Sequence, residues 1–128
     1  MALLLDTHAF VWWLEGSSKL SKRARAAIAD PDQQVFVSAA TAWELATKYR
    51  LGKLPSVAPI INDIAAQISL QSFEALEVTV VHGQRAGSLA GEHRDPFDRM
   101  LIAQARSEDL TLVSNEKLFD TFGVDRLW

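Results

Sequence analysis

Residues 2–16 read ALLLDTHAFVWWLEG and predict the first strand and helix of the protein. The apolar run ALLL (2–5) suits a short buried strand that breaks at an acid, Asp6. HAFVWWLEG (8–16) follows as a short helix. A buried strand that leads directly into a helix is typical of α/β proteins with a parallel sheet.

The same alternation of strands and helices continues along the chain. Ser38 is expected to cap a helix through AATAWELATKYRLG, which Gly52 stops. Further strands are predicted at VFVS (35–38), LEVTVV (76–81) and TLVS (111–114), with an extended end at DRLW (125–128). Further helices are predicted after Ser21 through KRARAAIADP, around 61–68, around QRAGSLAG (84–91), through the DPFD segment (95–98), and around EKLFDTFG (116–123). We therefore predict a three-layer α/β/α domain with a central parallel sheet of four to five short strands.

Length and composition indicate one globular domain over residues 1–128. Hydrophobic residues make up 48% of the chain and charged residues 23%, the net charge is −3, and there is no cysteine. The lack of cysteine excludes disulfides, thiolate metal sites and a cysteine nucleophile, and it fits a reducing cytoplasm. The longest apolar runs are too short to span a membrane, and MALLLD lacks the basic start of a signal peptide.

The entrance to the helix in HRDPFDRMLIAQARSEDL (93–110) has two interpretations. Asp95 suits the N-cap, Pro96 the first helical position, and Asp98 the third, where a carboxylate favours the free N–H groups. Local physics alone therefore accounts for DPFD as a helix start. The same acids could also form one wall of a site.

Four acids are expected over one edge of the sheet, because ligands gather at the carboxyl ends of parallel strands. They are Asp6, Glu44, Asp98 and Glu116. Each has a structural alternative: Glu44, for example, could simply pair with Lys48 one helical turn away. Taken together they would repel, since two carboxylates about 4 Å apart cost roughly 4 kcal/mol at an effective dielectric near 20.

A cluster of carboxylates needs a cation, and oxygen ligands favour Mg²⁺ or Mn²⁺. Zinc is not indicated, because His8, His82 and His93 show no ligand spacing and are expected on the surface or in loops. Magnesium held by carboxylates suggests phosphoryl chemistry with a metal-activated water. The chain has no Walker-type phosphate loop, no dinucleotide fingerprint and no nucleophile-elbow serine.

Over essentially its whole length the chain resembles the PIN-domain ribonucleases, in particular the VapC-type toxins of bacterial toxin–antitoxin pairs. The resemblance rests on an ordered series of segments: LLLDTHAFVWWLEG, VFVSAATAWELATKYRLGKL, HRDPFDRMLIAQA, LVSNEKLF and the closing LW. It implies that Asp6, Glu44 and Asp98 hold the metal and that Asp95 is an additional acid. The fourth segment usually reads Thr, a variable residue, then Asp, whereas Ser114, Asn115 and Glu116 stand here.

The resemblance also implies an activity and partners. Such enzymes cleave RNA, usually form homodimers, and are blocked by a cognate antitoxin that inserts a segment into the acidic groove. Because Glu116 is one methylene longer than the usual Asp, direct ligation and a water-mediated contact both stay open. Thr7 and Ser114 are candidates for orienting the acids or for satisfying backbone groups. Candidate RNA contacts are Arg94, Arg99, Lys48 and Arg50.

Three other classes of protein share some of these sequence features. A phosphatase of the haloacid dehalogenase type expects a second Asp two positions after the first, where this chain has His8. A receiver domain needs a phosphoacceptor Asp after a central strand, which LEVTVVHG lacks. A catalytically weakened PIN-fold module that only binds RNA or protein stays as the alternative.

Trp12 and Trp13 cannot share one helix face, so one is expected in the core and the other near an interface or partly buried.

Overall fold

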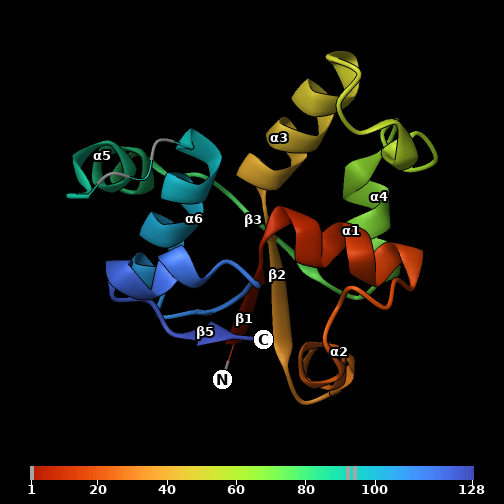
Figure 1. The fold of residues 1–128 in the computed structure, drawn as a ribbon, viewed down its shortest axis with the longest axis horizontal. Helices are drawn as coiled ribbons and strands as arrows, with labels where there is room; N and C mark the ends of the chain where they lie inside the picture. The colour runs from red at the N-terminus through yellow and green to blue at the C-terminus, as the bar shows by residue number, and fades with distance from the viewer. Residues whose placement is uncertain (1, 92, 94) are drawn as a thin grey trace.

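The apolar run at residues 2–5 forms the central strand of the sheet in the computed structural model, which describes residues 2–91, 93 and 95–128 (Figure 1). Strand β1 (Ala2–Leu5) pairs in parallel with β2 (Gln34–Ser38) on one side and with β4 (Thr111–Val113) on the other. Strands β3 (Glu74–Leu76) and β5 (Arg126–Leu127) complete the sheet at its two edges. Across the described residues the order is β3-β2-β1-β4-β5, and every pairing is parallel.

Helices cover both faces of this sheet. In Figure 1, α1, α2 and α4 lie to one side of the strands, and α5 and α6 lie to the other. The helical elements are α1 (Thr7–Glu15), α2 (Lys22–Ala29), α3 (Ala39–Arg50), η1 (Pro55–Val57), α4 (Ile64–Leu70), α5 (Val80–Ser88), α6 (Pro96–Ser107) and η2 (Lys117–Phe122). The predicted three-layer α/β/α architecture with a parallel sheet of four to five strands is therefore confirmed.

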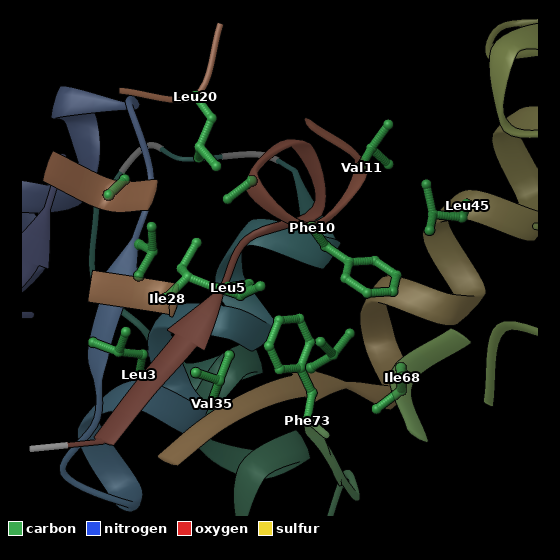
Figure 2. Packing of buried hydrophobic residues seen from close by; sticks show 14 of the residues in the cluster. Leu3, Leu5, Phe10, Val11, Leu20, Ile28, Val35, Leu45, Ile68 and Phe73 are labelled. Carbon is green, nitrogen blue, oxygen red and sulfur yellow. The ribbon is translucent and has the colours of Figure 1, made fainter. Parts of the chain in front are cut away.

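The core is divided into two layers by the alternation of side chains along β1. Leu3 and Leu5 point into the larger layer, where Figure 2 shows them beside Phe10, Val35 and other apolar side chains. Leu4 points to the opposite face, where it belongs to the cluster with Leu101 and Leu112. All three leucines are fully buried, because the strand is covered on both faces. This explains why the run is continuously apolar rather than alternating.

Strands β1 and β2 pass directly into helices through capping residues. Asp6 follows β1 and accepts from the backbone N–H of Ala9 at the start of α1. Ser38, the last residue of β2, caps α3 in the same way, and Ser21 caps α2, as predicted. Each cap satisfies N–H groups that the first helical turn leaves without partners. Functional side chains at these junctions are therefore held by well-defined backbone.

The predicted strand LEVTVV (76–81) is wrong in its extent. Strand β3 ends at Leu76, and Val80 and Val81 begin α5 instead. Thr79 caps this helix through a reciprocal hydrogen-bonded capping box with His82. The predicted helix at 84–91 correspondingly begins four residues earlier and ends at Ser88. A strong cap overrides the β preference of the valines, whose propensity for strands depends on packing that an exposed edge does not provide.

A tight turn over Asp30–Gln33 leads into β2 at the amino end of the strand. The side chain of Asp30 accepts from the backbone N–H of Asp32, at 2.9 Å, and its carbonyl accepts from that of Gln33. The turn lies at the edge of the sheet opposite to the one where Asp6 emerges.

No helix in the described ranges is long and apolar enough to cross a membrane.

Candidate functional site

One cavity at the carboxyl edge of the sheet receives all four predicted acids. It has a volume of about 90 Å³ and opens between the ends of β1 and β4 and the helices α3 and α6. Its lining residues are Asp6, Thr7, His8, Glu44, Lys48, Asp95, Asp98, Asn115, Glu116 and Phe119. Residues from four distant segments thus meet at the edge where ligands of parallel sheets gather.

Asp6 is held rigidly at the floor of the cavity. Its side chain is buried, and one carboxylate oxygen accepts from the backbone N–H of Ala9 at 2.8 Å. Burial raises the pKa of Asp6 above its ordinary value, while hydrogen bonds from Ser114 and Ala9 oppose that shift. A carboxylate in this position is costly to keep charged unless a cation approaches it.

Glu44 projects from the second turn of α3 and is also buried, with 3% of its surface exposed. The Thr7 hydroxyl donates to its Oε1 at 2.5 Å, and the Lys48 ammonium donates to its Oε2. The simple helical pair of Glu44 and Lys48, considered as an alternative to a site role, is therefore present. Because Glu44 is buried and the partly exposed Lys48 lines the same cavity, the pair also brings a cation among the acids.

Asp95 and Asp98 share the start of α6. Asp95 is the N-cap, as predicted, and accepts from the backbone N–H groups of Phe97 and Asp98 at 2.9 and 3.3 Å. Asp98 Oδ2 lies 3.0 Å from Nε2 of His93, without the alignment of a hydrogen bond. Burial, with repulsion from the neighbouring acids, raises the pKa of Asp98 to about 7, and Lys48 opposes the shift.

Glu116 stands apart from the other acids. Its side chain is exposed at the rim of the cavity, and Oε1 accepts from the backbone N–H of Leu118 at 3.4 Å at the start of η2. The Ser114 hydroxyl accepts from the backbone N–H of Glu116. Ser114 therefore contacts both Asp6 and the segment that carries Glu116.

The donor set fits a hard divalent ion. The cavity offers carboxylate and hydroxyl oxygens, the ligands of Mg²⁺ and Mn²⁺. Burial is the main cause of the raised pKa values of Asp6 and Asp98, and repulsion from neighbouring acids adds to it, so a cation would stabilise both carboxylates. Within residues 2–91, 93 and 95–128, no group of three or more acidic or histidine side chains is arranged closely enough to hold a metal ion.

The predicted cationic residues have different positions. Lys48 lines the cavity. Arg99 donates from its guanidinium to the backbone carbonyls of Ala86, Leu89 and His93, so it stabilises the α5–α6 connection. Among the residues that the structure describes, it pairs with no carboxylate. Arg50 is exposed at the end of α3, outside the cavity lining, and Arg94 lies outside the described residues.

The expectation that the three histidines lie on the surface or in loops is wrong for His82. That ring is buried on α5, and its Nε2 lies 2.8 Å from Oε1 of Glu108. His8 is exposed, but it lines the acidic cavity from the first turn of α1, a role that the sequence interpretation missed. Its position two residues after Asp6, in a helix that begins at the site, was the signal that could have revealed it.

The chain belongs to the PIN domain family, which matches residues 3–124. Its fold is similar to that of a chain in the crystal structure of VapBC2 from Rickettsia felis bound to a DNA fragment from their promoter. The identity is 19%, the match covers 99% of this chain and 98% of the other, and the TM-score is 0.71. A chain of the DNA-bound VapBC from Salmonella typhimurium gives 20% identity, 99% and 97% coverage and a TM-score of 0.71.

A third similar structure is that of Mycobacterium tuberculosis VapC20, described as a Sarcin-Ricin loop cleaving toxin. It is 18% identical, the match covers 95% of each chain, and the TM-score is 0.65. No curated protein matches this chain. The predicted membership of the PIN-domain family and the structural likeness to VapC toxins are therefore confirmed.

Proposed function

We propose that the protein is a divalent-metal-dependent endoribonuclease that hydrolyses RNA phosphodiester bonds with a metal-activated water. The observation that carries this proposal is the arrival of Asp6, Glu44, Asp98 and Glu116 at one small cavity. Membership of the PIN domain family supports it, as does the fold of VapC20, a toxin that cleaves the Sarcin-Ricin loop. We further propose that the protein is the toxin of a toxin–antitoxin pair, acting in the cytoplasm.

Each acid has a proposed role. Asp6, Glu44 and Asp98 would hold Mg²⁺, for which Mn²⁺ can substitute, and the exposed Glu116 would act at the rim through water. When bound, the metal polarises the phosphate and lowers the pKa of a bound water. Thr7 orients Glu44 through its 2.5 Å hydrogen bond, and Ser114 orients Asp6. Asp95 fixes the helix start that carries Asp98 and adds negative charge beside it.

We propose two protein partners. A cognate antitoxin would cover the acidic cavity, in keeping with the toxin–antitoxin complexes among the similar structures. A second copy of the chain would pair through an exposed apolar surface formed by Trp43, Val78, Val80 and Val81, which we call the apolar face. Exposed apolar surface of this kind marks protein interfaces, and Trp43 and Val78 line the same apolar groove of about 400 Å³.

Substitution of the acids tests the activity. Asp6→Asn or Asp98→Asn should lower RNA cleavage by more than about a hundredfold, since even supporting groups at metal sites contribute about 10- to 100-fold. Cleavage-site mapping on total cellular RNA after controlled expression is the measurement, with circular dichroism to show that the fold remains. Asp32→Asn, in the turn at the opposite edge of the sheet, is the matched control. Full cleavage by either purified site variant, free of contaminating nuclease, would contradict the proposal.

A domain that only binds RNA or protein is the second candidate. The observations in its favour are the engagement of Glu44 by Lys48 and the exposed, longer Glu116. Metal titration separates the two candidates, because a metal site is stabilised by RT ln(1 + [L]/Kd) when its ion binds. The endoribonuclease should show a rise in Tm with Mn²⁺ that Asp98→Asn abolishes, whereas a binding-only domain should show none.

A further inference from the structure

His8 belongs to an aromatic stack that begins at the rim of the acidic cavity. Its ring is exposed and lines the cavity, and it stacks on Trp12 with a centroid separation of 5.3 Å and an interplanar angle of 25°. Trp12 in turn contacts Trp128, with centroids 5.9 Å apart. Both tryptophans are half-buried and pack against the larger core layer. The exposed imidazole is therefore backed by anchored side chains.

The backbone under His8 is equally well fixed. His8 lies in the first turn of α1, and the carboxylate of Asp6 caps that turn through the Ala9 N–H at 2.8 Å. The four-residue spacing from His8 to Trp12 places the two rings on the same helix face. The ring beside the cavity is thus set at a defined position relative to Asp6, a proposed metal ligand.

Charge alone gives this site little attraction for RNA. The chain has a net charge of −3, and the cavity is lined by four predicted site acids together with Asp95. Lys48 is paired with Glu44, and the Arg99 guanidinium is bonded to backbone carbonyls. Apart from the proposed metal ion, the side chains at this site therefore offer the phosphates little attraction, and a contact to a base would add affinity that does not depend on phosphate charge. Stacking of a base on an aromatic ring supplies about 1–3 kcal/mol per base.

We propose that His8, backed by Trp12 and Trp128, is a stacking platform for one unpaired nucleobase adjacent to the scissile phosphate. This inference rests on the proposed ribonuclease function and deepens it, because it specifies the kind of substrate. A base inside a duplex already has both faces covered by its neighbours, so it cannot use the platform. The enzyme accordingly selects an unpaired or extruded nucleotide, as is usual for recognition of specific RNA sites.

The test compares two single-stranded probes of equal charge. One is a labelled decamer of riboadenylate, and the other is a decamer of the same length in which every nucleotide is abasic. Binding to the full-length protein is measured by fluorescence anisotropy with Ca²⁺, and again with EDTA. The wild-type protein should bind the riboadenylate decamer at least about fivefold more tightly than the abasic decamer, the lower limit that one stacked base gives.

Variants of His8 assign this preference to the ring. His8→Ala should abolish the preference for the riboadenylate decamer, whereas His8→Phe should retain it, because any aromatic face can stack. Leu70→Ala, at an exposed position on α4, is the control for loss of a large surface side chain. Thermal unfolding of each variant shows whether the fold is intact. Because His8 is exposed, its substitution should leave the fold intact.

The outcomes separate this inference from the proposed function. Equal affinity for the two decamers, or a preference that survives in His8→Ala, would overturn the stacking platform even if the protein cleaves RNA. Absence of RNA cleavage by the wild-type protein would instead overturn the ribonuclease proposal, whatever the decamers show. A base preference lost in both His8→Ala and His8→Phe would assign the contact to imidazole hydrogen bonding and overturn the stacking account.

Discussion

Two acids of this site each cap a helix and also line the cavity. Asp6 caps α1 while lying on the cavity floor, and Asp95 caps α6 at the cavity wall. A helix start and a site wall are therefore not competing interpretations, because a capping carboxylate can keep one oxygen for a ligand. This decides how the residues should be tested. Asparagine is a good N-cap, so Asp→Asn removes charge while it preserves the helix start.

Asp98 makes stability depend on pH in the absence of divalent ions. Its pKa is about 7 in the folded protein and 3.8 is the ordinary value, so the unfolded chain releases this proton at lower pH. The contribution of the Asp98 carboxyl group to the free energy of unfolding is fully present below pH 3.8 and is lost as pH rises through 7. With EDTA, the free energy of unfolding should therefore fall as the pH rises from about 4 to about 7. Urea denaturation across that range is the measurement.

The matched variant for this prediction is Asp98→Asn, which cannot ionise. Its free energy of unfolding should vary less over the same pH range than that of the wild-type protein. The raised pKa of Asp6 acts in the same direction, so some pH dependence should persist in the variant. Identical pH profiles for the two proteins would rule out Asp98 as the source.

Lys48 is expected to weaken metal binding while it supports cleavage. Its ammonium is bonded to Glu44. Burial lowers the pKa of Lys48, but the hydrogen bond and the charges of Glu44, Asp95 and Asp98 outweigh this and raise it. Lys48→Met removes a positive charge from the cavity that the divalent ion would occupy, and this loss of repulsion should raise the Mn²⁺ affinity severalfold. Isothermal titration with Mn²⁺ should show tighter binding, and RNA cleavage should slow. Weaker Mn²⁺ binding would mean that Lys48 chiefly positions Glu44.

At the scale of elements, the spacing of α3 and α6 sets the distance between Glu44 and Asp98. A buried hydrogen bond links the two helices: Ser38 Oγ, at the N-cap of α3, donates to Gln104 Oε1 on α6 at 2.6 Å. The Gln104 amide also donates to the backbone carbonyl of Glu77 at 3.1 Å. Trp43 and Phe97, the neighbours of the two acids, meet edge to face with centroids 4.9 Å apart.

Gln104→Leu should therefore loosen the site as well as the fold. The substitution leaves the buried Ser38 hydroxyl and the Glu77 carbonyl without this partner, a loss of about 1–3 kcal/mol in the free energy of unfolding. Urea denaturation measures the stability, and Mn²⁺ affinity measured at a temperature where the variant stays folded reports on the site. Gln67→Leu on α4 is the control, because no side-chain hydrogen bond of Gln67 to another helix occurs in the part of the chain that the structure describes. Unchanged stability and affinity in Gln104→Leu would refute the link.

A helix or strand could be predicted from sequence where its own residue pattern and capping residues favour the same structure as its packing in the folded protein. The runs at 2–5 and 35–38 are buried on both faces of the sheet and form strands as predicted, and the DPFD cap sets the start of α6. The LEVTVV prediction failed because Thr79 and His82 form a capping box that composition alone does not reveal. Local propensity decides least at a sheet edge, where β3 pairs only with β2.

Across the whole molecule, the gathering of the acids followed from topology, but their partners did not. A parallel sheet brings strand ends to one edge, so Asp6 and the residues after β4 could be placed together in advance. The engagement of Arg99 by three carbonyls and the place of His8 in an aromatic stack depend on tertiary contacts between distant segments. Such contacts leave no periodic pattern in the sequence.

The apolar face predicts a dimer at the same scale. Val80 is 88% exposed and Trp43 65% exposed, which is unfavourable for large apolar side chains in a monomer. Val80→Asp should therefore shift the protein from dimer to monomer in analytical ultracentrifugation. Leu70→Asp, at an exposed apolar position on α4 outside the apolar face, should leave the dimer intact. A wild-type protein that sediments as a monomer would remove the proposed dimer.

The Asp30–Gln33 turn offers a position where a fluorophore can be attached to the protein. The natural sequence has no cysteine, so Asp32→Cys would create a single thiol at an exposed position on the far edge of the sheet. A fluorophore attached there would report tumbling and partner capture without crowding the carboxylates. Because the proposed site lies at the carboxyl ends of the strands, residues at the amino ends can be changed without altering the site.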